Sequence, residues 1–263
     1  MDPSEPRSAS ARRTSIARSL ADGRHVRVAE LVEEFGVTDT SIRRDLAILE
    51  AEGLLRRVHG GAVGLQDDAR GRRYGEKLQH HLAEKGRIGA AAAEQVRPGE
   101  IVILNSGTTT LQVAASAPTH LRKASAITLV TNSLPIAEQV RSWAAPNLIM
   151  LGGLYLADEQ ATVGPQALEQ LRNISADWVF LGADGITLED GLTSGHVLMA
   201  DVDRLMAERA RRVVVTVDSS KVGHSGLVHV LDLGRIHMLI TDAAADAELL
   251  ESIRHKGVEV VLA

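Results

Sequence analysis

Apolar residues in the first quarter of the chain recur at helical spacing. Ile42, Leu46 and Leu49 fall on one face of a predicted helix, while the polar residues between them face away. We expect this helix to begin after Thr38, whose hydroxyl can accept an otherwise unpaired backbone N–H, and to be closed by Gly53. Two shorter amphipathic helices are predicted upstream, one on Ile16, Ala17 and Leu20 and the other on Val28, Leu31, Val32 and Phe35.

The pattern after the third helix is that of a tight β-hairpin. Leu54 and Leu55 lead into basic residues and the pair Gly60 and Gly61, so positive charge lies near the tip. Three helices and such a hairpin form a winged helix-turn-helix, whose third helix reads base edges of double-stranded DNA. Arginine can offer its guanidinium fork to guanine or phosphate, and Ser and Thr can bond to either. The expected DNA contacts are Thr38, Thr40, Ser41, Arg43, Arg44, Arg56, Arg57 and His59.

From residue 77 onward, short apolar runs alternate with helical patterns. Seven buried strands with helices between them predict an α/β domain, in which a mostly parallel sheet is covered on both faces. The expected strands are 101–104, 127–130, 148–151, 178–181, 213–217, 237–240 and 258–262.

The segments that follow these strands are polar and rich in small residues. Ligands of parallel sheets lie beyond the carboxyl ends of the strands. In the segment 105–110, Gly107 permits close backbone approach, and the next helix begins there with free N–H groups for a phosphate. One such loop alone is typical of an ordinary turn, but five in one domain favour a ligand site. The expected effector contacts are Asn105, Gly107, Thr108, Thr109, Thr110, Asn132, Gly152, Asp184 and Lys221.

A chain of 263 residues is long enough for one small and one medium domain. The segment before residue 77 has little apolar content and three glycines, which is typical of a linker. The expected organisation is a polar tail at 1–9, a DNA-binding domain at 10–64, a linker at 65–76 and an effector-sensing α/β domain at 77–263.

Composition excludes several other classes of protein. With no cysteine there is no disulfide framework or thiolate metal site, and the scattered histidines give no metal pattern, so we expect neither metal nor cofactor. No stretch reaches the roughly 20 apolar residues of a membrane span, and the polar first residues lack the core of a signal peptide. We therefore expect a cytoplasmic protein without a membrane partner.

Net charge does not by itself indicate DNA binding. The whole chain carries −5, and residues 1–63 hold ten arginines against ten acidic residues. Distribution matters more than the sum, because one basic face can still meet phosphates. A nearly neutral domain should bind weakly as a single copy, so we expect a homodimer or homotetramer on repeated half-sites. The early arginines that would join this face are Arg12, Arg13, Arg18 and Arg24.

The segment TDTSIRRDLAILEAEGLLRRVHGGAV strongly resembles the winged helix-turn-helix of the DeoR family of bacterial transcription regulators, including its RxHGGA wing. The ordered motifs EKxxIG, GTTT, VTNS, LGG, GADG, DSSK and TD resemble the family's C-terminal sensor domain. That domain is similar in fold to ribose-5-phosphate isomerase and glucosamine-6-phosphate deaminase. The resemblance implies that a phosphorylated sugar controls DNA binding, with the GTTT loop, Asn132 and Lys221 at the phosphate.

The chain departs from the family pattern at two places. Family members commonly carry Asp where Asn105 stands, and often an acidic residue near Met199. Contacts to the sugar part of the effector can therefore differ here.

The leading hypothesis is a transcriptional regulator, most simply a repressor of carbohydrate-metabolism genes that a phosphorylated sugar releases. The alternative is a sugar-phosphate isomerase or deaminase with an accessory DNA-binding domain. That chemistry needs a positioned carboxylate base, for which only Asp184 and Asp218 are available at the strand ends. A third possibility is an architectural DNA binder that responds to no metabolite.

Overall fold

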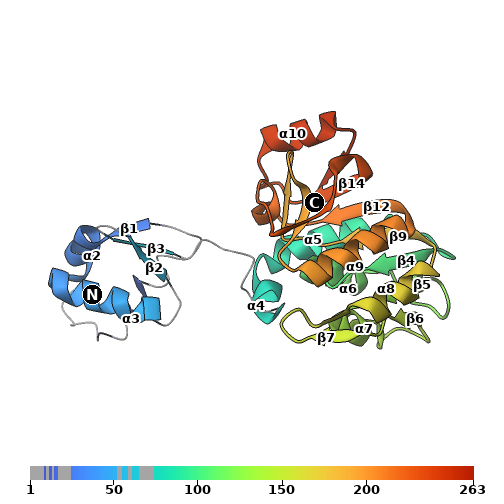
Figure 1. Cartoon of the computed structure of the whole chain (residues 1–263), viewed down its shortest axis with the longest axis horizontal. Coiled ribbons are helices and arrows are strands. Elements are labelled where there is room, and N and C mark those ends of the chain that lie inside the picture. Colours follow the sequence, from blue (N-terminus) through green and yellow to red (C-terminus); the bar gives the residue numbers. More distant parts are fainter. Residues whose placement is uncertain are drawn as a thin grey trace. The chain divides into compact units, whose positions relative to one another are not determined.

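The computed structural model describes Ala9, Arg12, Arg13, Ser15 and Ile16, and residues 25–51, 55–58, 61–64 and 74–263. The chain divides into two compact units, residues 1–68 and 69–263. Figure 1 shows the elements of both.

The first unit combines helices with a small antiparallel sheet. Gly36 closes the second predicted helix in the left-handed conformation, with φ of 63°. The predicted hairpin acquires a third strand, in the order β1-β3-β2. Ile16, Ile42 and Leu46 are fully buried in the core between helices and sheet. The elements are β1 (His25–Arg27), α2 (Val28–Phe35), α3 (Asp39–Ala51), β2 (Leu55–Val58) and β3 (Gly61–Gly64).

The second unit is built on a seven-stranded sheet in which every neighbouring pair is parallel. Its order is β15-β14-β12-β9-β4-β5-β6, so the predicted mostly parallel sheet is confirmed. The strands are β4 (Ile101–Leu104), β5 (Thr128–Thr131), β6 (Asn147–Met150), β9 (Ala176–Leu181), β12 (Ala210–Thr216), β14 (Met238–Thr241) and β15 (Glu259–Leu262).

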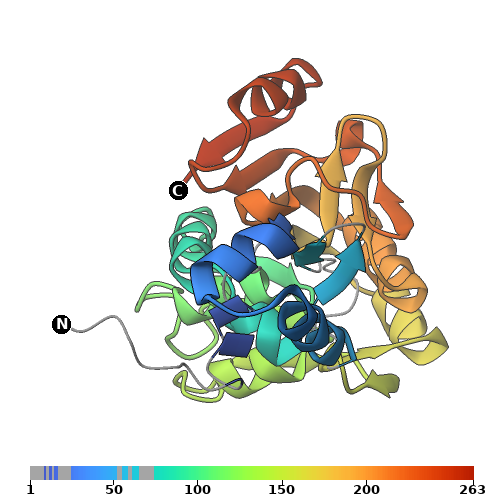
Figure 2. The ribbon, with the colours of Figure 1, turned by 90° about the vertical axis from the view of Figure 1, so that its left-hand side faces the viewer.

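Helices cover both faces of this sheet (Figure 1). Successive residues of a strand point to opposite faces, so Val102 and Leu104 join one apolar core and Ile103 joins the other. α10 lies beside β15 near the C-terminus, as the turned view in Figure 2 shows. One face carries α5 (Leu82–Ala93), α6 (Thr108–Ala115) and α7 (Leu134–Val140), and the other α8 (Pro165–Arg172), α9 (Val197–Glu208) and α10 (Ala247–His255).

Several short elements had no clear sequence signal, because they span only a few residues without a sustained apolar period. They form a two-stranded hairpin, a separate three-stranded antiparallel sheet, and a helix that starts within the expected linker. In the described part of the chain, every helix is too short or too polar to cross a bilayer. These elements are α4 (Tyr74–Gln79), β7 (Leu154–Leu156), β8 (Ala161–Val163), β10 (Gly185–Thr187), β11 (Gly191–Ser194) and β13 (Val228–Leu231), with 3-10 turns η2 (Ser219–Lys221) and η3 (Leu233–Arg235).

Candidate nucleic-acid interface and effector site

The start of α3 is fixed by Thr38. Its hydroxyl oxygen accepts the Ser41 backbone N–H at 3.3 Å and lies 3.0 Å from the Ser41 hydroxyl. Thr38 and Thr40 are exposed and Ser41 is half-buried, whereas Ile42 on the next position is fully buried. The predicted division of this helix into a packed face and a polar face is therefore present.

Arg43 and Arg44 both face solvent, but their surroundings differ. The Arg43 guanidinium makes a two-pronged contact with Asp39 one turn earlier, with Nε–Oδ1 and Nη2–Oδ2 distances of 2.5 and 3.2 Å. Within the described residues, nothing pairs with Arg44. Arg43 is thus held in one orientation, while Arg44 is open to a ligand.

The packed side of α3 also carries a buried carboxylate that the sequence pattern did not reveal. Asp45 is 3% exposed and pairs with Arg12 at 2.6 Å and with Arg13 at 3.4 Å. Arg12 and Arg13 thus neutralise a buried charge, and their place in a phosphate-facing cluster stays a prediction.

The wing lies only partly within the described residues. Arg56 and Arg57 belong to β2, where they are paired in register with Val63 and Ala62 of β3. His59 lies outside the described residues, as do the side chains of Arg56 and Arg57.

In the second unit, the loop between β4 and α6 occupies the centre of the carboxyl edge, the sheet edge where the strands end. Thr108, Thr109 and Thr110 form the first turn of α6 and are all at least nine-tenths buried. A Cβ at Gly107 would lie 3.1 Å from the Gly182 Cα, so this glycine lets the loop after β4 approach the loop after β9. The helix start offers its first N–H groups at this edge.

Asn105 holds these two loops together. Its amide nitrogen donates to the Gly182 carbonyl at 2.9 Å and to Asp203 Oδ1 at 3.1 Å. Its amide oxygen accepts the N–H groups of Gly107 and Gly182 at 3.1 and 3.0 Å. The Thr110 hydroxyl also donates to this oxygen. The side chain expected to touch the effector is thus bonded mainly to the protein.

Asp203 on α9 was missed by sequence reasoning. It is 5% exposed, and burial is the main cause that raises the pKa of its carboxyl to about 7. The hydrogen bond from Asn105 lowers this pKa, whereas the nearby carboxylates of Asp184 and Glu159 raise it. It lies one turn after Met199, whose sulfur is 3.9 Å from the Ser106 hydroxyl. Asn105, which stands where family members commonly carry Asp, therefore donates a hydrogen bond to an acidic residue of α9, Asp203.

Lys77 on α4 is the cation beside this group of acids. Its ammonium lies 3.2 Å from Glu159 and 3.5 Å from Asp184, which also accepts the Gly195 N–H at 2.8 Å. Burial acts to lower the pKa of Lys77, but the two carboxylates raise it above its ordinary value. Burial likewise raises the pKa of Glu159, although Lys77 opposes the rise. Lys77 is therefore charged, and its single positive charge balances one of the two negative charges of Glu159 and Asp184.

A second buried lysine, Lys85 of the EKxxIG motif, links α5 to the same edge. Lys85 is 3% exposed. Its ammonium donates to the Lys77 carbonyl at 2.5 Å and lies 3.8 Å from Asp218. Lys221 follows Asp218 in η2 and is half-buried. The motif was part of the resemblance, but its lysine was not singled out as a site residue.

The remaining expected contacts are spread along the edge. Asn132, at the end of β5, is fully buried and donates to the Thr162 carbonyl at 2.9 Å. Its amide oxygen is buried and has no hydrogen-bond partner in the described part of the chain, which is unusual outside a functional site. Gly152 is exposed after the outermost strand β6, where its N–H donates to Gln170. Neighbouring strands therefore bring Asn105, Asn132 and Asp184 together, while Gly152 and Lys221 lie toward opposite sides.

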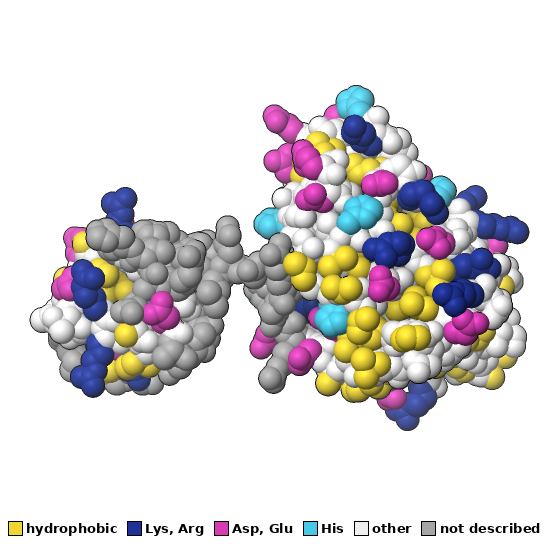
Figure 3. Space-filling view, in the orientation of Figure 1, with side chains coloured by type: hydrophobic (Ala, Val, Ile, Leu, Met, Phe, Trp, Pro, Cys, Tyr) yellow, Lys and Arg dark blue, Asp and Glu magenta, His cyan; other side chains and the backbone are white. Residues whose placement is uncertain are grey.

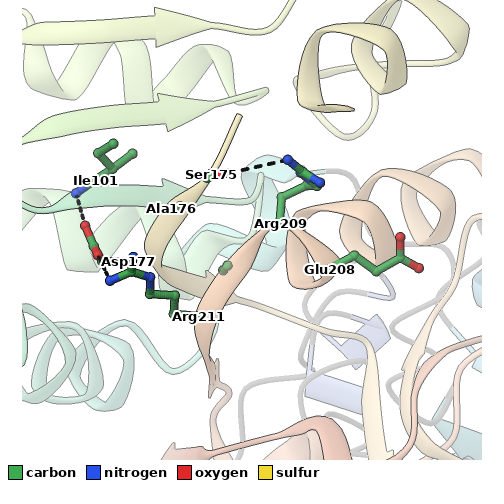
Figure 4. Close-up of a pocket in the computed structure, with 8 residues that line it drawn as sticks. Ile101, Ser175, Ala176, Asp177, Glu208, Arg209 and Arg211 are labelled. Atoms are coloured by element: carbon green, nitrogen blue, oxygen red, sulfur yellow. Dashed lines mark hydrogen bonds and ion pairs between the residues drawn. The ribbon is translucent and has the colours of Figure 1, made fainter. Parts of the chain in front are cut away.

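The opposite edge of the sheet has a hollow of about 500 Å³ near the starts of β4, β9 and β12 (Figure 4). Three of its charged groups, Asp177, Arg209 and Arg211, already have partners. Asp177 accepts the Ile101 N–H at 2.9 Å and lies 3.6 Å from Arg211, while Arg209 donates to the Ile174 carbonyl. Two buried polar groups without partners among the described residues, Asn132 and Thr241, lie at the carboxyl edge instead.

Comparison with known proteins identifies both units. The DeoR-like helix-turn-helix domain matches residues 12–67, and the DeoR C-terminal sensor domain matches residues 80–243. A candidate aga operon transcriptional repressor of Escherichia coli O157:H7 is 36% identical over 96% of this chain and 93% of its own length. The HTH-type transcriptional regulator GlpR of Haloferax volcanii is 35% identical over 95% of this chain and 96% of its own.

Among solved structures, ribose 5-phosphate isomerase A of Methanocaldococcus jannaschii is 18% identical over 52% of this chain and 53% of its own, with a TM-score of 0.39. The full-length relatives are named as transcriptional regulators rather than as isomerases or deaminases. The chain therefore belongs to the DeoR family of transcriptional regulators, with a DNA-binding unit and a C-terminal sensor domain.

Proposed function

We propose that this regulator represses genes of carbohydrate metabolism and that a phosphorylated sugar, bound at the carboxyl edge of the sensor sheet, changes its affinity for operator DNA. The observation that carries the proposal is the start of α6, where backbone N–H groups lie beside buried hydroxyls and an unpartnered Asn132 oxygen. A helix N-terminus favours an anion through its N–H groups and its dipole. The GTTT loop therefore takes the phosphate and Lys221 adds charge.

Operator contact belongs to the exposed face of α3. Arg44 and the preoriented Arg43 read guanine or phosphate, while Thr40 and Ser41 fix the position of the helix on the duplex. The wing residues Arg56, Arg57 and His59 complete this proposed interface.

Effector binding affects the DNA-binding unit through α4, the helix that follows the segment connecting the two units. The Tyr74 N–H donates to the Asp158 carbonyl at 2.9 Å, and Lys77 bridges Glu159 and Asp184. A ligand that engages Asp184 changes the charge balance that holds Lys77. A coupling of about 1 to 3 kcal/mol would change operator affinity by roughly 5- to 150-fold.

Repeated half-sites require more than one copy of the chain. Large apolar side chains are exposed on the sensor unit, among them Leu154, Val197 and Leu227 at 57%, 53% and 64%. Figure 3 shows apolar side chains gathered over the region of α8, α9 and β7. Contiguous apolar surface of this kind supports a homodimer or homotetramer, which sedimentation of the purified protein tests directly.

The first experiment is thermal unfolding of the full chain with a panel of sugar phosphates, because a ligand that binds only the native state raises the midpoint. The active compound is then titrated in gel-shift assays with operator DNA. Lys221→Ala and Thr108→Ala should retain DNA binding and respond less to the compound, while the exposed Lys256→Ala should respond normally. If every sugar phosphate left the midpoint unchanged, the effector assignment would be wrong.

A further inference from the structure

Three carboxylates lie within electrostatic range of one another beyond the phosphate loop, and we call them the carboxylate cluster: Glu159, Asp184 and Asp203. They come from the turn after β7, the loop after β9 and the middle of α9. Asp184 and Glu159 both raise the pKa of Asp203, and Asp184 raises that of Glu159, so the three charges act on one another. The cluster is joined to the phosphate loop by Asn105, which bonds to both.

The positive charge beside this cluster is too small to balance it. Lys77 pairs with Glu159 and Asp184, and no cation among the described residues forms an ion pair with Asp203. Asp203 is more than nine-tenths buried, and within the described part of the chain its one hydrogen-bond partner is the Asn105 amide at Oδ1. A buried carboxyl without a countercharge is costly to ionise and therefore holds its proton, so a cationic group that arrives with a ligand would favour its charged form.

A buried atom without a hydrogen-bond partner among the described residues lies near Glu159. It is Nδ1 of His196, at the start of α9, and the ring is close enough to affect the pKa of Glu159. A buried polar atom with spare bonding capacity beside the cluster indicates a ligand position rather than a closed structural network.

We infer that the carboxylate cluster selects an effector with an ammonium group, so that the ligand is a phosphorylated amino sugar and Asp203 is the residue that discriminates it from a neutral sugar phosphate. The inference rests on the proposed function, which supplies the phosphate at the GTTT loop. The two ends of the site then have opposite preferences. The start of α6 favours an anion, and the cluster favours a cation, as in a sugar that carries both groups.

A hydroxyl in place of the ammonium would make a hydrogen bond but would leave the negative charge of the cluster in excess. Charge-assisted hydrogen bonds are about twice as strong as neutral ones. The amino compound should therefore bind about tenfold or more tightly than its hydroxyl counterpart.

The test measures calorimetric affinity and thermal midpoint of the full chain with matched pairs, namely glucosamine 6-phosphate against glucose 6-phosphate and galactosamine 6-phosphate against galactose 6-phosphate. N-acetylglucosamine 6-phosphate removes the charge of the amine while keeping its nitrogen. Asp203→Asn keeps an acceptor for Asn105 and removes the negative charge, and Asp201→Asn, half-exposed on the same helix, is the control.

The expected result is a preference for the amine of about tenfold in at least one series, present in Asp201→Asn and lost in Asp203→Asn. Equal or tighter binding of the neutral sugars by the unmodified chain would overturn this inference and leave the proposed function standing. A panel in which no sugar phosphate binds would overturn both. Stabilisation by magnesium chloride alone, lost in Asp203→Asn, would assign the cluster to a metal and also overturn it.

Discussion

The outer face of α3 and the carboxyl edge of the sensor sheet both carry polar side chains, but they hold them in opposite ways. On α3, Arg43 and Arg44 project into solvent, and Arg43 forms one local ion pair with Asp39. At the carboxyl edge, Asn105 and Asp203 are buried and bonded to loops from distant parts of the chain.

This contrast separates two kinds of binding surface. An exposed side chain contributes little to folding, so its replacement should change affinity alone. A buried polar side chain that braces its own site contributes to folding and function together, so its replacement alters both. The predictions below test this separation.

The largest effect is expected on the exposed face. Arg43→Ala with Arg44→Ala should weaken specific operator binding about a hundredfold or more, because each bidentate contact to a base contributes about 1 to 3 kcal/mol. The thermal midpoint should stay near that of the unmodified chain. Fluorescence anisotropy with an operator selected from random duplexes measures the affinity. Arg141→Ala, an exposed arginine just after α7, is the control, and an unchanged footprint in the double variant would remove Arg43 and Arg44 from the interface.

An effect of similar free energy, on stability rather than on DNA affinity, is expected at the carboxyl edge. Asn105→Ala leaves the N–H groups of Gly107 and Gly182 and the Asp203 carboxyl without their partner, so it should destabilise the sensor unit by about 3 kcal/mol. Urea unfolding measures the loss. Asn173→Ala, on the surface at the end of α8, should cost less than about 0.5 kcal/mol. Similar losses of unfolding free energy in the two variants would show that Asn105 does not stabilise the two loops that it joins.

The difference between the two regions also explains what the sequence predicted. Ile42, Leu46 and Leu49 lie within one helix, so local periodicity was enough to place Thr40, Arg43 and Arg44 on the opposite face. The seven strands were likewise found from apolar runs, since strands buried on both faces are nearly continuous in apolar residues.

Sequence reasoning could not reach contacts that depend on the packing of distant elements. Asp203 meets Asn105 across 98 positions of sequence, and Lys77 meets Glu159 across 82. Asp203 lies in an ordinary amphipathic helix, where an acidic residue is usually solvated. Asp45 was missed for the same reason, because its partners Arg12 and Arg13 belong to another helix. The EKxxIG motif was the available signal for Lys85.

The stability of the chain should depend on pH through the buried carboxyl of Asp203. Its pKa of about 7 in the folded chain lies above the ordinary pKa of 3.8 for an aspartate, so the folded state holds the proton more tightly. Its contribution to stability is therefore fully present below the unfolded pKa and is lost as pH rises toward 7. Between about pH 5 and pH 8 the unmodified chain should lose about 2 kcal/mol relative to Asp203→Asn.

Urea unfolding of both proteins across this range measures the difference. The half-exposed Asp201→Asn should follow the unmodified chain at every pH, since it leaves the buried carboxyl in place. Parallel stability curves for the unmodified chain and Asp203→Asn would contradict a buried, proton-holding carboxyl.

The smallest effect concerns the ion pair on α3. Asp39→Asn removes a negative charge that lies next to the proposed DNA surface and frees Arg43 from its two-pronged partner. An ion pair between two exposed side chains is screened by solvent and contributes little to folding, so stability should change little. Operator affinity should rise about two- to threefold, because the guanidinium no longer has to leave a carboxylate before it meets phosphate or guanine.

Binding to random duplex should rise by at least as much, since the removed charge repels phosphates of any sequence. Glu34→Gln, an exposed acid on α2, is the matched control for charge alone. A loss of operator affinity in Asp39→Asn would mean that Asp39 orients Arg43 toward a base. The exposed face of α3 would then also depend on a supporting side chain. The two regions would then differ only in how deeply their supporting side chains, Asp39 and Asn105, are buried.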